Sequence, residues 1–223
     1  MEKEVQPFEF KQCVTVPKST GKSAKNLRKL RQLLRRVTDE SIIHHTCQYF
    51  SYGHVLEHTN GFAQWVAESL GEKALSEHLS NIDPYDFWSI EDLRHELLKA
   101  IDSRLQVPPR PRDAMGGDEF FFSEAITLVF PAHIRALNLA EFLIGIRYID
   151  KSSIYYHFYE ARIRLKGETD DFSKWFASSL ANEGLADKIG SIDPFMHTLE
   201  EVRKHIVEIV EDEIKKTMEE RSA

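Results

Sequence analysis

The sequence predicts a mainly α-helical protein built from two tandem, pseudo-symmetric repeats of about five helices each. Two observations carry this prediction: the second half of the chain repeats the first, and apolar residues within each half recur mostly at helical spacing. A third is that residues able to cap helices precede the apolar stretches. We expect repeat 1 at residues 1–104, a Pro/Gly-rich linker at 105–118 and repeat 2 at 119–223.

The duplication is visible when the chain is aligned with itself. AKNLRKLRQLLRRVTDESIIHH matches ALNLAEFLIGIRYIDKSSIYYH at an offset of 112 residues. The register continues with NGFAQWVAESL against DDFSKWFASSL at 110, and with IEDLRHEL against LEEVRKHI at 109. Trp65 and Trp175 recur beside other apolar residues, so we assign both to the core.

Helix starts are marked by side chains that accept hydrogen bonds from otherwise unpaired backbone N–H groups. Such a residue precedes each helical stretch in both repeats. The expected caps are Asn26, Thr38, Asn60 and Ser89 in repeat 1, and Asn138, Asp150, Asp170 and Thr198 in repeat 2.

Each repeat begins with a segment of uncertain type. Residues 8–16 and 120–128 are rich in aromatic and β-branched side chains, which favours a short strand, although periodicity alone leaves the type open. If both are strands, they can pair across the pseudo-twofold, because a lone strand leaves its backbone groups unsatisfied.

Composition indicates an ordinary globular protein. With 223 residues, 42% of them hydrophobic, the chain can bury one sizeable core or two small ones. No run reaches the ~18 apolar residues of a membrane span, and the N-terminus lacks a signal-peptide pattern. Cys13 and Cys47 cannot form a disulfide framework, so we expect free thiols, a cytoplasmic location and no membrane association.

The charge distribution suggests a protein partner. The net charge of -7 argues against general nucleic-acid binding, yet residues 18–36 carry basic side chains and no acidic one. We expect the second half of this segment to present a basic helix face. It is either simply solvated or a site for an acidic protein, including the acidic second half of another copy. The candidate partner-binding residues are Arg28, Lys29, Arg31 and Arg35.

The matching helix of repeat 2, ALNLAEFLIGIRYI, is almost wholly apolar. We therefore expect it to lie in an interface, either between the repeats or in a homo-oligomer.

A histidine cluster raises the question of a metal. His44, His45, His54 and His58 surround Cys47, but only His45 meets a histidine, His157, in the second repeat. Adjacent histidines on a helix point about 100° apart and cannot easily share an ion. We expect no metal and no cofactor. Likewise, GKS at 21–23 lacks the earlier glycine of a phosphate-binding loop, so nucleotide binding is not expected.

A serine and a histidine one helical turn apart recur in both repeats. Ser41 and His45 in SIIHH correspond to Ser153 and His157 in SIYYH, and each pair can touch on one helix face. One interpretation is a hydrogen-bonded, half-buried histidine. The alternative is a polar pocket shared by the two histidines. A catalytic Ser–His pair lacks an accompanying oxyanion-hole or GxSxG motif.

The order of AxNL, SIIHH or SIYYH, NGFAQW or DDFSKW, and IDP resembles a bacterial family of unknown function over nearly the whole chain. The resemblance supports the repeat fold and implies an association with genes of glycogen and trehalose metabolism. The resemblance implies no catalytic residues. We predict a non-catalytic interaction or regulatory module. The alternative is a small-ligand sensor or enzyme with a pocket around His45 and His157.

Overall fold

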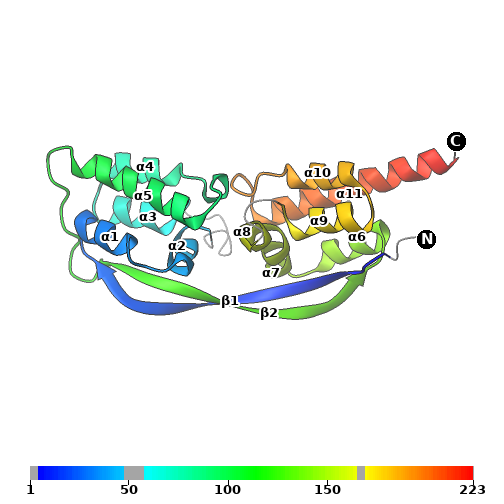
Figure 1. The fold of residues 1–223 in the computed structure, drawn as a ribbon, viewed down its shortest axis with the longest axis horizontal. Coiled ribbons are helices and arrows are strands. Elements are labelled where there is room, and N and C mark those ends of the chain that lie inside the picture. The colour runs from blue at the N-terminus through cyan, green and yellow to red at the C-terminus, as the bar shows by residue number, and fades with distance from the viewer. Residues whose placement is uncertain (1–4, 48–57, 165–168, 223) are drawn as a thin grey trace. The chain divides into compact units, whose positions relative to one another are not determined.

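The computed structural model describes residues 5–47, 58–164 and 169–222 (Figure 1). It contradicts the predicted fold class, because the protein is α+β rather than mainly α. Strands β1 (Phe8–Ala24) and β2 (Phe120–Ala136) each span 17 residues and pair antiparallel into a two-stranded sheet. Among the described helices, none has the length and apolar character to span a membrane.

Both strands run well past the predicted 8–16 and 120–128. They continue through Pro17 and Pro131, which a two-stranded sheet tolerates because each strand has an open edge where a missing N–H breaks no ladder bond. The added halves are largely solvent-exposed, so no hydrophobic pattern marks them in the sequence. Gly21 lies inside β1 with φ of 70°, so the GKS segment belongs to a strand rather than to a phosphate-binding loop.

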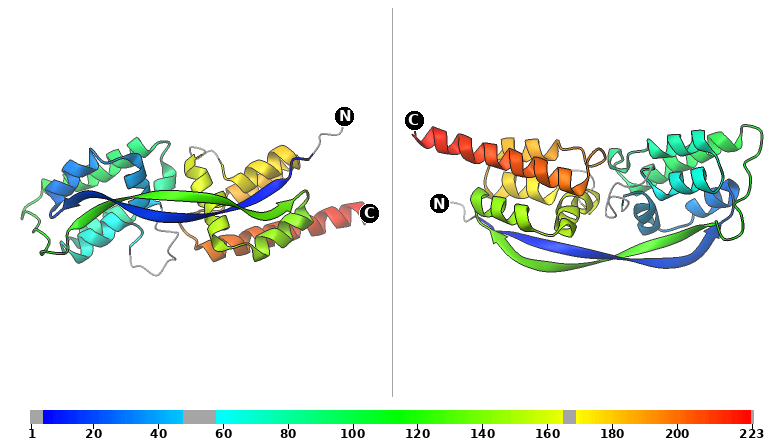
Figure 2. Two further views of the ribbon diagram at one scale, coloured as in Figure 1. Left: turned by 90° about the horizontal axis from the view of Figure 1, so that it is seen from below. Right: turned by 180° about the vertical axis from the view of Figure 1, so that it is seen from behind.

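The predicted pairing of the two segments is confirmed. Glu9 forms an ion pair with Arg135 at 3.1 Å, and farther along β1 the Thr20 hydroxyl donates to the carbonyl of Phe122 at 2.7 Å. The strands run side by side in every view (Figure 2).

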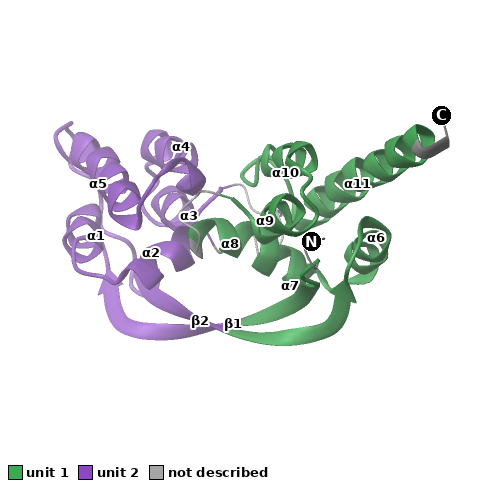
Figure 3. Cartoon of the chain, turned by 45° about the vertical axis from the view of Figure 1, so that its right-hand side comes forward, with its two compact units in different colours: residues 1–14, 128–223 green, residues 15–127 purple. Residues whose placement is uncertain are grey.

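The chain forms two compact units, and each contains half of both strands (Figure 3). Unit 1 comprises residues 1–14 and 128–223, and unit 2 comprises 15–127. In unit 1, Phe8 of β1 packs with Phe172 and Trp175, at ring-centroid distances of 5.4 and 5.6 Å. In unit 2, Phe120 of β2 stacks on Phe62 at 5.1 Å. The aromatic start of each sequence repeat therefore packs on the helices of the other repeat.

The helices of unit 2 follow the expected caps. Asn26 accepts a hydrogen bond from the N–H of Lys29 at 2.9 Å, and Ser89 accepts from the N–H of Asp92 at 3.1 Å. The helical elements are α1 (Leu27–Leu34), α2 (Asp39–Thr46), α3 (Gly61–Glu68), α4 (Lys73–Ser80), the 3₁₀ turn η2 (Pro84–Asp86) and α5 (Ile90–Leu105).

Unit 1 is capped in the same way, with Asn138 accepting from the N–H of Glu141 at 2.9 Å and Asp170 from that of Ser173 at 2.9 Å. Its elements are α6 (Leu139–Tyr148), α7 (Lys151–Ile154), the π-helical η3 (Tyr155–Glu160), α8 (Ala161–Arg164), α9 (Asp171–Ser179), α10 (Glu183–Gly190) and α11 (Leu199–Ser222). The segments α7, η3 and α8 follow one another without a break.

The predicted core positions of the two tryptophans are confirmed. Trp65 and Trp175 are 7% and 6% exposed, and each indole N–H donates at 2.7 Å to a carbonyl just before a strand, of Asp118 and Gln6 respectively. Cys13 and Cys47 are free and buried, and burial raises the pKa of each thiol to about 12.

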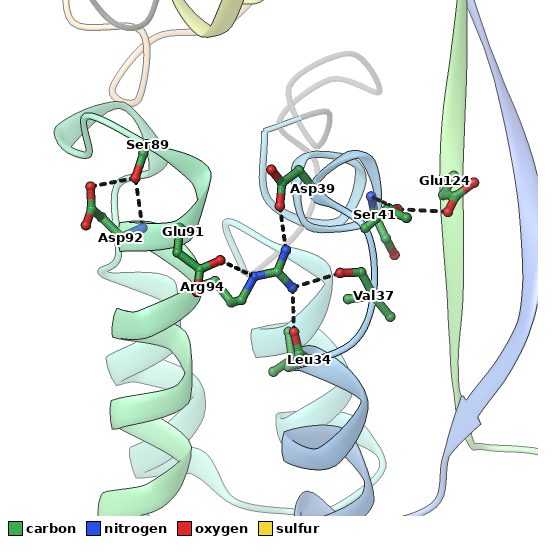
Figure 4. Close-up of polar contacts among 10 residues, drawn as sticks. Leu34, Val37, Asp39, Ser41, Ser89, Glu91, Asp92, Arg94 and Glu124 are labelled. Atoms are coloured by element: carbon green, nitrogen blue, oxygen red, sulfur yellow. Dashed lines mark hydrogen bonds and ion pairs between the residues drawn. The ribbon is translucent and has the colours of Figure 1, made fainter.

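A buried arginine joins α5 to the end of α1 (Figure 4). Arg94 donates from Nη1 to the carbonyls of Leu34 and Val37 at 2.6 and 2.9 Å. Its remaining nitrogens reach the carboxylates of Asp39 and Glu91. The bond to Leu34 satisfies a carbonyl that the end of α1 leaves without an intrahelical partner, and the bond to Val37 satisfies one in the turn before α2. Arg203 repeats the arrangement in unit 1, donating to the carbonyls of Ile146 and Ile149 at 2.8 and 2.7 Å.

We expect Arg94→Met to lower the free energy of unfolding by about 3 kcal/mol, because the buried carbonyls of Leu34 and Val37 lose their donor. Urea denaturation followed by circular dichroism measures the change. The matched control is Arg35→Met at the exposed C-cap of α1, expected to cost less than about 0.5 kcal/mol. Equal losses in the two variants contradict the role of Arg94.

Candidate functional site

Ser41 and His45 converge on the backbone of one strand residue. His45 Nε2 accepts the N–H of Ser123 in β2 at 3.0 Å, and the Ser41 hydroxyl donates to the carbonyl of Ser123 at 2.9 Å. The serine–histidine spacing therefore lets α2 satisfy both backbone polar groups of a residue that would otherwise lack partners.

His157 makes the equivalent bond in unit 1. Its Nε2 accepts the N–H of Lys11 in β1 at 2.8 Å, and Lys11 matches Ser123 at the 112-residue offset. Ser153 Oγ is buried and has no hydrogen-bond partner among the described residues. The two histidines thus bind the strand backbone alike, while the two serines differ.

A carboxylate binds the second ring nitrogen of His157 in unit 1. His157 Nδ1 lies 2.9 Å from Oδ2 of Asp171, the first residue of α9. Because Nε2 accepts a backbone N–H, the neutral ring carries its proton on Nδ1 and donates it to Asp171. The matching residue in unit 2 is Gly61, where a Cβ would stand 3.4 Å from Nδ1 of His45.

This geometry does not favour acid–base catalysis. A general base needs a lone pair directed at the substrate, and the Nε2 lone pair of His157 is taken by the N–H of Lys11. The Ser41 hydroxyl is likewise engaged with a backbone carbonyl. Of the four predicted Ser–His residues, Ser41, His45 and His157 hydrogen-bond the strand backbone, whereas Ser153 does not.

An open pocket of about 480 Å³ lies beside His157 within unit 1. Its walls come from the start of β1, from η3 and from α9. The lining side chains that bear on binding are Lys11, Tyr156, His157, Asp171, Lys174 and Trp175.

The uncommitted charge in this pocket is positive. Lys11 and Lys174 are exposed, and neither forms an ion pair with another residue that the structure describes. The two acidic side chains are engaged, Asp171 with His157 and Glu9 with Arg135.

Unit 2 lacks these charges at the matching positions. Gln64 replaces Lys174, Ser123 replaces Lys11 and Gly61 replaces Asp171. The sequence reasoning missed all three residues of unit 1, because it looked for what recurs between the repeats. The sequence signal for these residues is that the aligned positions of the two repeats differ in charge.

The basic segment is partly neutralised. Arg28 and Lys29 of α1 and its C-cap Arg35 are exposed, whereas Arg31 is half-buried and donates two hydrogen bonds to Asp102 of α5. Three of the four predicted partner-binding side chains therefore remain solvent-facing.

The histidine cluster is described only in part, because His54 lies outside the described residues. The rings of His44 and His45 meet edge-on at 4.8 Å, and His58 Nδ1 lies 3.2 Å from the hydroxyl of Ser76. Within residues 5–47, 58–164 and 169–222, no group of three or more potential metal ligands converges.

The fold defines a class of α+β protein in which a long two-stranded sheet contributes to both helical units. The chain belongs to a family of unknown function, DUF5752, whose model matches residues 5–211. This confirms the resemblance to a family of unknown function spanning nearly the whole chain, whereas the link to glycogen and trehalose genes stays a prediction.

A solved structure is also similar. OrfY from Thermoproteus tenax aligns with a TM-score of 0.78 and 30% sequence identity, covering 95% of this chain and 97% of that chain. No curated protein matches the sequence.

The largely buried ring of His45 makes stability depend on pH. Burial, and secondarily the neighbouring His44, lowers the pKa of His45 to about 3, against about 6.5 in an unfolded chain. Between these values the unfolded state binds a proton that the folded state does not, so stability falls as the pH drops below about 6.5. The expected loss attributable to His45 at pH 5 is about 2 kcal/mol.

Urea denaturation at neutral pH and at about pH 5 tests this value. His45→Gln keeps an acceptor for the N–H of Ser123 but cannot titrate, so its stability should change less with pH by that amount. His95→Gln, at an exposed position on α5, should behave as the wild type. Identical pH dependence in His45→Gln and the wild type contradicts the prediction.

Proposed function

We propose that the chain is a non-catalytic binding module whose unit 1 pocket takes a small anion. The observation that supports this is the pair Lys11 and Lys174, which line the pocket without an ion-pair partner among the described residues. Asp171, which also lines the pocket, is engaged by His157.

The pocket also suggests the rest of the ligand. Tyr156 and Trp175 present largely buried aromatic rings in its wall, at 9% and 6% exposure. A volume of about 480 Å³ suits a small organic molecule. A phosphate or carboxylate group between the lysines, joined to a flat or apolar body against the rings, matches this lining.

The hydrogen bonds of His157 fit binding better than reaction. They fix the backbone of Lys11 in β1 to η3, and through Asp171 to the start of α9. A ligand that bridges Lys11 and Lys174 then stabilises the packing of β1 on α9, because it binds only the assembled pocket. This coupling is how a regulatory module can respond to a metabolite.

We expect pyrophosphate, citrate or AMP to raise the melting temperature and change tryptophan emission at concentrations up to about 10 mM. Replacing Lys11 by Ser and Lys174 by Gln, the residues of unit 2, should weaken binding at least tenfold per lysine, by roughly 1.5 kcal/mol each. Isothermal titration calorimetry measures the dissociation constants.

The control variant carries Lys204→Gln and Lys215→Gln on α11, which remove two exposed lysines of the same unit away from the pocket. It should bind as the wild type does. If no probe binds, or if both double variants bind alike, the pocket is not an anion site.

A second function is supported by a separate observation, the exposed Arg28 and Lys29 of α1 and its exposed C-cap Arg35. They offer a basic surface to an acidic protein. Exposed charges contribute little to folding, so a binding role and a stability role can be separated.

We expect Arg28→Glu, Lys29→Glu and Arg35→Glu together to leave the melting temperature nearly unchanged and to abolish salt-sensitive binding of poly-L-glutamate. Arg31→Glu alone should lower the melting temperature, because it sets two carboxylates against each other at Asp102. Thermal denaturation and a salt-dependent pull-down measure the two effects. Unfolding of the triple variant, or undiminished binding at low salt, contradicts this role.

A further inference from the structure

A small pocket lies within unit 2, where the segment between α5 and β2 passes the start of α1 (the unit 2 pocket). Its volume is about 200 Å³, and its walls come from the first residues of α1, from Leu105 at the end of α5 and from the segment itself. The N–H of Ala114 donates to the carbonyl of Lys25 at 2.7 Å and holds this segment beside α1 (Figure 1). The unit 2 pocket shares no residue with the unit 1 pocket, so it goes beyond the anion site proposed above.

The wall that carries Arg110 is fixed on both sides of this residue. On one side, Arg104 of α5 donates to the carbonyl of Pro109 at 3.1 Å. On the other side, the side chain of Asn26 donates to Asp113 at 2.8 Å. A ligand therefore finds the backbone of this wall already in place, which lowers the entropic cost of binding.

The uncommitted charge in the unit 2 pocket is positive. Arg28 and Arg110 both line it, both are exposed, and neither forms an ion pair with another residue in the described part of the chain. The carboxylate of the lining, Asp113, is engaged by Asn26 and lies 3.3 Å from Nζ of Lys25. Two guanidinium groups thus remain to meet an anion.

Unit 1 is built differently at the matching place. Its helix α11 continues to Ser222, past the position that matches Leu105 at the 109-residue offset, whereas α5 ends at Leu105 and the chain turns back toward α1. Ala140 also stands where unit 2 has Arg28. The pocket and its charge therefore arise from the segment that joins the two repeats.

We propose that the unit 2 pocket binds a phosphate group, which accepts hydrogen bonds from Arg28 and Arg110 together. Each guanidinium offers a fork of two parallel N–H donors that matches two oxygens of an anion. A carboxylate has two oxygens and satisfies one fork, whereas the oxygens and the higher charge of a phosphate suit both. The volume of about 200 Å³ lies below the ~300–1,000 Å³ of pockets for drug-sized ligands, so it suits a phosphate with few further atoms.

Isothermal titration calorimetry with inorganic phosphate tests the site. The starting protein carries Lys11→Ser and Lys174→Gln, so that the unit 1 pocket has lost its lysines. We expect a dissociation constant of about 1 mM or lower. Adding Arg110→Gln should raise it at least about tenfold, and Arg110→Lys, which keeps the charge but not the fork, should raise it by less. Arg112→Gln, the matched control, removes an exposed arginine of the same segment outside the pocket and should change nothing.

Two further probes define the chemistry. Glycerol 3-phosphate represents the phosphate ester of a small molecule, and tighter, equal or weaker binding than inorganic phosphate shows which source the pocket prefers while supporting the site. Acetate, a small carboxylate, should bind at least about tenfold more weakly than phosphate. Equal binding of acetate overturns the proposal, as does no phosphate binding up to about 10 mM or undiminished binding by the folded Arg110→Gln variant. Circular dichroism checks that each variant is folded.

Trypsin gives a readout that is confined to this segment. A phosphate that joins Arg110 to α1 stabilises the closed segment, so saturating phosphate should slow cleavage after the exposed Arg112 at least about threefold. The same phosphate should not slow this cleavage in the Arg110→Gln variant. Cleavage after Arg112 that is unchanged by phosphate in the parent protein overturns the proposed position of the ligand.

Discussion

A hydrogen bond from a strand N–H to an imidazole nitrogen is the interaction on which both units depend. A residue of a two-stranded sheet has backbone groups that face away from the other strand, and burying them against a helix is costly unless an acceptor is present. His45 and His157 provide that acceptor at matching places. The phenylalanines beside the bonded strand residues can then enter the helical core.

The two units use this bond differently. In unit 2 the ring of His45 stands beside Gly61, and the hydroxyl of Ser41 completes the hold on the strand. In unit 1 the ring of His157 is oriented by Asp171, and the bonded strand residue is a lysine that faces a pocket. The same histidine–backbone bond therefore lies beside an open pocket in unit 1.

Some features of this architecture could be predicted from the sequence, and others could not. Capping residues and core tryptophans can be recognised from the local sequence. A cap bonds within one helical turn, and the large apolar indole ring favours burial. The length of the strands could not be predicted from the sequence, because their exposed halves carry no alternating apolar pattern. Pro17 also suggests the end of a strand. The role of Lys11 and Lys174 in the pocket could not be predicted either. Most lysines are exposed, and the sequence around them does not indicate which residues lie nearby in the fold.

The sequence by itself determined the similarity of its two halves, the helix starts, the core tryptophans and the spacing of serine and histidine one helical turn apart. These follow from local hydrogen bonding and from the period of the helix. Only the tertiary structure decided that the aromatic start of each repeat packs on the helices of the other, and that Lys11 and Lys174 line one pocket. Residues 163 positions apart meet there because an antiparallel strand pair carries the start of the chain to its second half, a consequence of long-range pairing that no local pattern encodes.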